Sequence, residues 1–286
     1  MDTQNAITVA WEPNEDDIKV IGAWLLTKQS ENTRRAYRRI AMGLLAYTHK
    51  HLADMTLFDA QEYINMLEGE NSSIALATNV LKSLATFQSN IGHGINFGKM
   101  LKPPAISDEL ANRILSEAEV IRMIDRETNP RNHAMIHLLY HAGLRVSEVV
   151  ALTWEHIRES DHGAILDITL AKGGKSRRVL ISADMYNELL TLRGAGAYVF
   201  QSRKNKSGLP MLPRQVDNIV LEAAKRAGID KQVSAHWLRH SHASHATNNG
   251  AKPGVLQNTL GHKSLLTTMR YVHLNPDESS SQFIKV

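Results

Sequence analysis

The sequence predicts a mainly α-helical protein of two domains with one small antiparallel β-sheet. Three observations lead to this prediction. At 286 residues the chain is longer than one typical hydrophobic core requires and suits two compact domains. Most segments have the three- to four-residue apolar spacing of helices, and several follow a capping residue. Residues 164–170 and 177–182 are instead rich in β-branched side chains and flank a glycine-rich turn, which indicates a hairpin.

The first part of the chain, residues 1–104, has the pattern of four helices. Asn14 and Thr56 are residues of the type that caps a helix start, and glycines stand at two of the expected ends. The expected helices cover about 15–29, 31–51, 57–69 and 72–90. Two prolines and a polar run in LKPPAISDE (101–109) then oppose helix formation, so we expect residues 105–112 to link the two domains.

The second part, residues 113–286, begins with further helix signals. SEAE (116–119) is a capping-box pattern for a helix to about Glu127, and Asn129 is a cap followed by Pro130 at the first helical position. After the hairpin, YVF (198–200) is a candidate third strand. Further helices are expected near 182–193, 213–227, 235–248 and 264–273.

Composition restricts the functions that the chain can have. The absence of cysteine excludes disulfides, thiolate metal sites and cysteine nucleophiles. No apolar run approaches the roughly 20 residues of a membrane span, and the acidic N-terminal stretch lacks the features of a secretory signal, so we expect a cytoplasmic protein without a membrane partner. A net charge of +4 and a pI near 9.2 permit a polyanionic partner. The densest basic cluster is TRRAYRR (33–39).

The most unusual stretch is SAHWLRHSHASHATNNGA (234–251), which has four histidines in an expected helix. His236 and His240 have the spacing of two zinc ligands, whereas His236 and Arg239 have the spacing of an imidazole beside a guanidinium. The other polar motifs are HAGLRVSE (141–148), AKGGKSRR (171–178), LGHKS (260–264) and MRYVHL (269–274). Together they are rich in cationic donors and offer no third metal ligand, which favours a phosphate site without metal or other cofactor.

In this order, the motifs resemble those of the tyrosine site-specific recombinases, also called phage integrases or the Xer- and Cre-like family. Each residue alone has an ordinary structural explanation, and the ordered set carries the resemblance. A transposon- or phage-borne member is suspected. By position the resemblance implies these catalytic residues: Arg145, Lys172, His236, Arg239, His262 and Tyr271, with Glu148 in support.

The implied reaction is conservative DNA strand exchange. Two guanidiniums, those of Arg145 and Arg239, would hydrogen-bond the non-bridging oxygens of the scissile phosphate. Tyr271 would attack the phosphorus to form a 3′-phosphotyrosine, which stores the energy of the broken bond, so neither ATP nor metal is needed. His236 is the family's usual candidate for accepting the proton. Lys172, with Lys175 as its rival, would protonate the leaving 5′ oxygen.

The resemblance also implies a fold and a mode of DNA binding. The first domain resembles the family's helical (SAM-like) core-binding domain, which closes over DNA as a clamp, and the second resembles the DNA breaking-rejoining catalytic domain. The alternative for the basic cluster is a solvated helix face. First-rank candidates for DNA contact are Arg34, Arg35, Arg38 and Arg39; second-rank candidates are Asn79, Lys82, Lys175, Arg177, Arg178, Arg203 and Lys204.

The implied partner is double-stranded DNA with an inverted-repeat core site. A dimer would bind each site, and a homotetramer would join two sites for integration, excision or resolution. The tail (274–286) is either a frayed end or a segment that docks into a neighbouring protomer. Two rival functions remain at this level: a type IB topoisomerase, which shares the chemistry but not the synapsis, and a DNA-binding regulator without catalysis.

Overall fold

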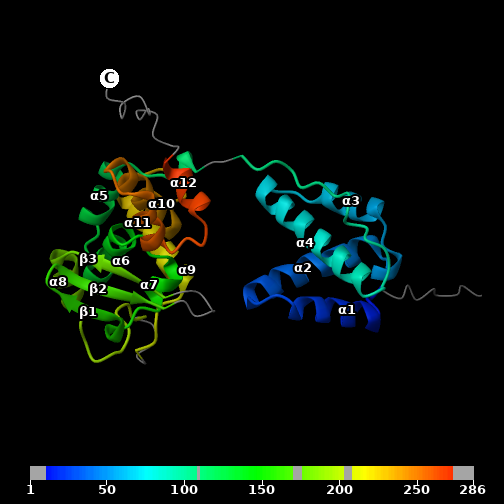
Figure 1. The fold of residues 1–286 in the computed structure, drawn as a ribbon, viewed down its shortest axis with the longest axis horizontal. Coiled ribbons are helices and arrows are strands. Elements are labelled where there is room, and N and C mark those ends of the chain that lie inside the picture. The colour runs from blue at the N-terminus through cyan, green and yellow to red at the C-terminus, as the bar shows by residue number, and fades with distance from the viewer. Residues whose placement is uncertain (1–10, 108–109, 170–175, 203–207, 273–286) are drawn as a thin grey trace, which may run out of the picture. The chain divides into compact units, whose positions relative to one another are not determined.

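The computed structural model describes residues 11–107, 110–169, 176–202 and 208–272. The chain divides into two compact units, Met1–Ser107 and Asp108–Val286, and each is described by itself (Figure 1). The fold class is the predicted one: helices dominate, and the described strands form one small antiparallel sheet. None of the described helices combines the length and apolarity needed to cross a bilayer.

In its described part, residues 11–107, the first unit is a bundle of four α-helices with a short 3-10 turn. Its elements are α1 (Glu15–Leu26), α2 (Glu31–Thr48), η1 (Leu52–Asp54), α3 (Leu57–Met66) and α4 (Asn71–Asn90). Asn14 and Thr56 form the predicted N-terminal caps, because each side chain accepts a hydrogen bond from the third residue of its helix. Trp24, Leu44 and Leu81 are among the side chains fully buried in the core between these helices.

Three of the expected helices are shorter than predicted at their C-terminal ends. α2 ends at Thr48 because His49 adopts a left-handed conformation, with φ 51°, and its amide bonds back to the Leu45 carbonyl. α1 and α3 end three residues before the predicted positions, at Leu26 and Met66. In α3 the residue after the helix, Leu67, is already extended, so the predicted end at a glycine was too late.

The second unit contains the sheet and eight α-helices in its described part. Its elements are η2 (Ala111–Arg113), α5 (Glu117–Asp125), α6 (Pro130–His141), α7 (Val146–Val150), η3 (Trp154–His156), β1 (Ile157–Ser160), β2 (Gly163–Ile168), β3 (Arg177–Ile181), α8 (Ala183–Leu190), α9 (Pro213–Arg226), α10 (Ala235–Asn248), α11 (Pro253–Leu260) and α12 (Leu265–Val272). Buried α6 packs against α5, α8 and α10, and α8 also packs on β2. The caps at Ser116 and Asn129 form as predicted.

The sheet has the strand order β1-β2-β3, with both pairs antiparallel. The predicted hairpin is β2 and β3, and its last described pair toward the turn is Ile168 with Arg177. The prediction of a third strand at residues 198–200 was wrong, because Tyr198 forms only an isolated bridge with Thr153. The third strand is β1, whose sequence IRES has three polar residues in four and which lies at the edge of the sheet.

Two helices that were not predicted from the sequence, α7 and α11, contribute to the site. α7 has only five residues. α11 begins with Pro253 at a first-turn position and ends before Gly261, which is left-handed with φ 63°. These are ordinary start and stop signals of a helix, and they were present in the sequence.

A small apolar cluster holds the last described helix in place. Tyr271 of α12 packs with Leu110, Ala243 of α10, and Leu256 and Leu260 of α11. A helix of eight residues is marginal by itself in water, so α12 depends on this tertiary packing for its position. The packing therefore determines where the tyrosine side chain lies.

Candidate active site

Arg239 is the buried centre of the site. It lies in the second turn of α10, its exposed fraction is 2%, and its two terminal nitrogens donate to the carbonyls of Gly143 and Leu260, each at 2.6 Å. Burial, and after it the neighbouring charge of Arg145, lowers its pKa to about 10. The guanidinium therefore stays charged at neutral pH and has a fixed position.

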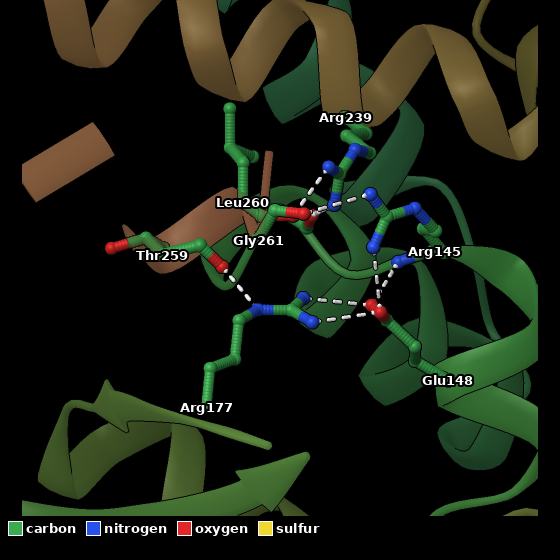
Figure 2. A network of polar contacts seen from close by, with 8 residues as sticks. Arg145, Glu148, Arg177, Arg239, Thr259, Leu260 and Gly261 are labelled. Atoms are coloured by element: carbon green, nitrogen blue, oxygen red, sulfur yellow. Dashed lines mark hydrogen bonds and ion pairs between the residues drawn. The ribbon is translucent and has the colours of Figure 1, made fainter. Parts of the chain in front are cut away.

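Arg145 lies at the N-terminal boundary of α7, where a glycine turn brings it toward α10. Gly143 is left-handed, with φ 58°, and a Cβ atom there would lie 2.6 Å from the His242 ring, so only glycine permits this close approach. The Arg145 guanidinium donates from Nη1 to Glu148 Oε1 at 2.9 Å and from Nη2 to the Gly261 carbonyl at 3.3 Å. Two guanidiniums from distant segments thus lie in one site (Figure 2).

Glu148 is a buried carboxylate that accepts hydrogen bonds from two arginines. Its Oε2 accepts from the Arg145 backbone N–H at 2.7 Å, and Arg177 donates to both oxygens at 2.8 Å. Burial alone would raise the pKa of Glu148, but the hydrogen bonds and charges of Arg177 and Arg145 outweigh it and lower that pKa. Glu148 is therefore ionised at neutral pH.

This arrangement changes the expectation for Arg177. Its side chain is only 8% exposed, and its guanidinium also donates from Nε to the Thr259 carbonyl at 2.7 Å (Figure 2). A guanidinium with these buried partners is not available as a free cation for DNA. The physical reason is the neighbouring Glu148, which captures the arginine at the start of β3.

Tyr271 has a buried hydroxyl that contacts a histidine. The residue is 4% exposed, and its Oη lies 2.6 Å from His240 Nδ1 on α10. Burial raises the pKa of Tyr271, against the lowering effect of Arg239 and Arg270, and burial likewise lowers the pKa of His240 to about 4. At neutral pH a protonated phenol thus donates to a neutral imidazole. Because α10 carries both Arg239 and His240, the Tyr271 hydroxyl is bound to the helix that holds the buried guanidinium.

The two predicted histidines flank this pair. His236 packs edge-on against His240, with ring centroids 4.5 Å apart, and the His262 ring stacks against Tyr271 at 6.4 Å. His262 Nδ1 lies 2.9 Å from the hydroxyl of buried Thr268, which fixes its ring. Burial, followed by the charge of Arg239, lowers the pKa of His236 and lowers that of His262 to about 4.

The sequence reasoning missed the contact of His240. The resemblance selected His236 as the candidate for accepting the tyrosine proton, whereas the hydrogen bond to Tyr271 comes from His240. The signal was its position next to Arg239 and one turn after His236. The described residues contain no group of three histidine or carboxylate side chains arranged to hold a metal ion.

The candidate DNA contacts differ in exposure. On α2, Arg35, Arg38 and Arg39 are exposed, while half-buried Arg34 donates from Nε to the Lys28 carbonyl at 2.8 Å. Exposed Asn79 lies on α4 near Lys82, whose ammonium bonds to the Leu101 carbonyl at 2.9 Å. The side chain of Arg178 is 73% exposed, 3.5 Å from an Asp167 carboxylate oxygen. Three of these candidates, Lys175, Arg203 and Lys204, lie outside the described residues, as does the catalytic candidate Lys172.

Known proteins are similar to this chain over most of its length. The phage integrase family matches residues 107–278. A tyrosine recombinase of Thermosipho africanus is 30% identical over 269 residues, which cover 88% of this chain and 92% of the relative. The tyrosine recombinase XerD of Neisseria meningitidis serogroup B is 31% identical over 270 residues, which cover 88% of this chain and 90% of XerD.

Two solved structures share the fold. The Tn1549 transposon integrase in complex with circular intermediate DNA has a TM-score of 0.76 at 15% identity, covering 94% of this chain and 99% of that one. A lambda integrase tetramer bound to a Holliday junction has a TM-score of 0.71 at 18% identity, covering 88% and 80%.

Two anchored guanidiniums and a buried tyrosine hydroxyl in one domain are the groups that phosphoryl transfer to a phenolic oxygen requires. The chain belongs to the phage integrase family. It is an enzyme of the tyrosine recombinase class, which performs site-specific DNA recombination through a covalent phosphotyrosine.

Proposed function

We propose that Tyr271 is the nucleophile and that Arg145 and Arg239 stabilise the charge that develops on the scissile phosphate. The observation that carries this proposal is the anchoring of both guanidiniums on main-chain carbonyls, next to the α10 helix that holds the tyrosine hydroxyl. Donors fixed before the reaction need no reorganisation when charge develops, and losing one such donor typically costs about 3 to 4 kcal/mol of barrier.

We infer that the tyrosine proton passes first to His240. Its imidazole is neutral, since burial lowers its pKa to about 4, and its Nδ1 already accepts the hydroxyl hydrogen bond. As the Tyr271 oxygen bonds to phosphorus, the bond from phosphorus to the 5′ oxygen breaks. That oxygen takes a proton from Lys172 or Lys175. His236 and His262 are neutral donors for the phosphate oxygens.

We propose that residues 1–104 form a core-binding domain that holds DNA, joined through residues 105–112 to a catalytic domain of residues 113–286. The division of the chain after Ser107 and the exposed arginines of α2 support this. DNA is the ligand of the related Tn1549 integrase structure, which supports DNA as the partner here. Because exposed arginines bind phosphates, the affinity of the protein for DNA should depend on salt concentration.

We propose that the working assembly is a homotetramer on two inverted-repeat core sites, with a dimer on each, acting in the cytoplasm on a phage or transposon DNA. The tetrameric lambda integrase on a Holliday junction supports this stoichiometry. The tail, as a candidate for docking into a neighbouring protomer, lies outside the described residues.

A covalent-trapping experiment tests the nucleophile. The full chain is incubated with nicked suicide substrates tiled across the DNA that flanks its own gene, and adducts are resolved on denaturing gels. Wild type should form a covalent adduct with one of these substrates. Tyr271→Phe should form none, because the substitution removes the phenolic oxygen that bonds to phosphorus. Mass spectrometry should locate the nucleotide on Tyr271.

Two outcomes would contradict the proposal. One is an adduct of undiminished yield with Tyr271→Phe, which would assign the nucleophile to another residue. The other is the absence of any adduct with the wild-type chain across the full panel. A matched control is Tyr186→Phe, on α8, which removes a hydroxyl elsewhere in the same domain.

A further inference from the structure

Three consecutive carbonyl oxygens at the end of α11 each accept a hydrogen bond from a different arginine. The pairs are Thr259 with Arg177 at 2.7 Å, Leu260 with Arg239 at 2.6 Å, and Gly261 with Arg145 at 3.3 Å (Figure 2). The last carbonyls of a helix have no partner within it and carry the negative end of its dipole. One helix end therefore orients three cations, and the proposed function uses only two of them.

Arg177 is the third of these arginines, and it is bound from two sides. Besides the bond to Thr259, it forms a two-pronged ion pair with Glu148, with both N–H···O distances at 2.8 Å. Such a planar pair fixes the orientation of both groups. Arg177 thereby joins the start of β3 to α7 and to the end of α11.

Glu148 is shared between Arg177 and Arg145. Its Oε1 accepts from Nη1 of both arginines. Without Arg177, the buried carboxylate would have Arg145 as its remaining arginine partner and would offset the positive charge that Arg145 presents. With Arg177 in place, two guanidiniums share one negative charge, and Arg145 remains available to an anion.

Packing adds a second link to the site. A Cβ atom on Gly261 would lie 3.0 Å from Arg177 Cδ and 3.1 Å from its Nη1, so the turn that precedes His262 lies directly on the arginine side chain. The φ of 63° at Gly261 also favours glycine. A change at Arg177 would therefore reach the LGHKS turn as well as Arg145.

We propose that Arg177 is a positioning residue of the phosphate site: it acts through Glu148 and the end of α11 to hold Arg145, and it makes no contact with DNA. This inference rests on the proposed function, because it concerns the same site. It replaces the expectation that Arg177 is a DNA contact.

The test compares Arg177→Met, which keeps much of the stem but removes all donors, with Arg177→Lys, which keeps a point charge. The matched control is Arg158→Met. Arg158 is an exposed arginine on strand β1, and it forms an ion pair with Asp167 on β2. Single-turnover adduct formation is measured with the full chain at saturating protein, on the suicide substrate found above. Thermal unfolding verifies that each variant is folded at the assay temperature.

We expect Arg177→Met to form the adduct about 10²-fold more slowly, because a displacement near 1 Å of a group that positions the reaction can cost that much. Arg177→Lys should recover part of the rate, and Arg158→Met should match wild type. DNA affinity and its salt dependence should be unchanged in Arg177→Met, since no phosphate contact is removed.

A second substrate separates positioning from a general loss of structure. A methylphosphonate at the scissile position replaces one charged oxygen by a methyl group, so less positive charge is needed in the transition state. The ratio of the wild-type rate to the Arg177→Met rate should then be at least about tenfold smaller on the methylphosphonate than on the phosphodiester. The reason is that Arg177→Met misplaces an arginine charge that the methylphosphonate needs less. If Arg177→Met does not fold, the same comparison is made with Arg177→Lys.

Three results would overturn the inference. They are an undiminished rate for Arg177→Met; an equal loss on both substrates, which would mean a merely structural role; and a weaker affinity with a smaller salt slope, which would mean a DNA contact. Failure of the proposed function is distinguishable, because then either wild type would form no adduct or Tyr271→Phe would form it in undiminished yield.

Discussion

Two arginine-rich regions of this molecule use the same side chain in opposite ways. In the second unit, Arg239 is 2% exposed and both of its terminal nitrogens bond to main-chain carbonyls. On α2 of the first unit, the Arg35 side chain is 76% exposed, and its ion pair with Glu31 is loose, at 3.8 Å. Ion pairs of this exposed kind contribute about 0 to 1 kcal/mol.

The difference reflects what each region has to do. Under the proposed function, stabilising a transition state requires donors that are already oriented, which agrees with arginines fixed by carbonyls and one carboxylate. Holding a DNA backbone, as proposed for α2, requires cations that can adapt to it and exchange with counterions, which agrees with the exposure of Arg35, Arg38 and Arg39. Burial and hydrogen bonding therefore distinguish the two roles where the residue type does not.

The largest effect is expected from releasing a fixed arginine. Arg239→Ala should slow adduct formation by about 10³-fold, because it removes two placed donors and leaves the Gly143 and Leu260 carbonyls without their partner. The measurement is single-turnover cleavage of the suicide substrate, with thermal unfolding recorded beside it. Arg239→Lys is the matched variant, and it should recover little, since a point charge cannot reach both carbonyls. If Arg239→Ala slowed adduct formation less than tenfold, the fixed arginines of the second unit would not differ in role from the exposed arginines of α2.

A smaller effect is expected from low pH. It should lower the stability of the second unit, which contains the fixed arginines. Burial lowers the pKa of His240, His242 and His262 to about 4 each, so in the folded state they remain neutral until the pH is near 4. In the unfolded chain they take up protons near pH 6.5. The unfolded state therefore binds more protons in this window, and stability should fall as the pH drops from about 6.5 toward 4.

Urea unfolding followed at several pH values measures this slope. Each histidine contributes at most about 1.4 kcal/mol per pH unit, and less where solvent reaches the ring. His242→Asn should make the slope shallower, because it removes one of the three groups and keeps a donor for the Tyr140 carbonyl. The exposed His162 lies in the turn between β1 and β2, and His162→Asn is the control. An unchanged slope in His242→Asn would contradict this account.

The smallest effect is expected on α2, and it should appear in binding. Replacing Arg35 and Arg39 by alanine should weaken DNA binding and lower the slope of log affinity against log salt by about 1.8, if each arginine neutralises one phosphate. The single-turnover rate at saturating protein should change far less than the affinity. Lys19→Ala, an exposed lysine of α1 with local ion pairs, is the control. An unaltered salt slope would mean that these arginines form only a solvated face.

Much of this architecture could be predicted from local sequence. Caps such as Asn14, Ser116 and Asn129 act within a few residues, so the helix starts are written in short motifs. The helix ends were less accurate, because the left-handed His49 ended α2 without a glycine. β1 was missed because an exposed edge strand of four residues has little apolar signal.

Candidate residues of the site could be selected from the sequence, but their contacts could not. Arg145, Arg239 and Tyr271 follow from motif order, whereas the bond between His240 and Tyr271 depends on how α12 packs on α10 across 31 positions of sequence. Arg177, beside a glycine-rich turn, has the sequence context of a solvated cation. Its burial results from Glu148, 29 positions away, which no local pattern could indicate.

The number of residues in α11 determines the directions in which its terminal carbonyls point. Successive residues of an α-helix are rotated by about 100° around its axis, so the direction of each terminal carbonyl depends on how many residues precede it. Inserting or deleting a single residue within Pro253–Leu260 would point all three carbonyls elsewhere and detach three arginines together. An insertion of the same size in the exposed segment just before the helix, near Asn249, would leave their directions intact.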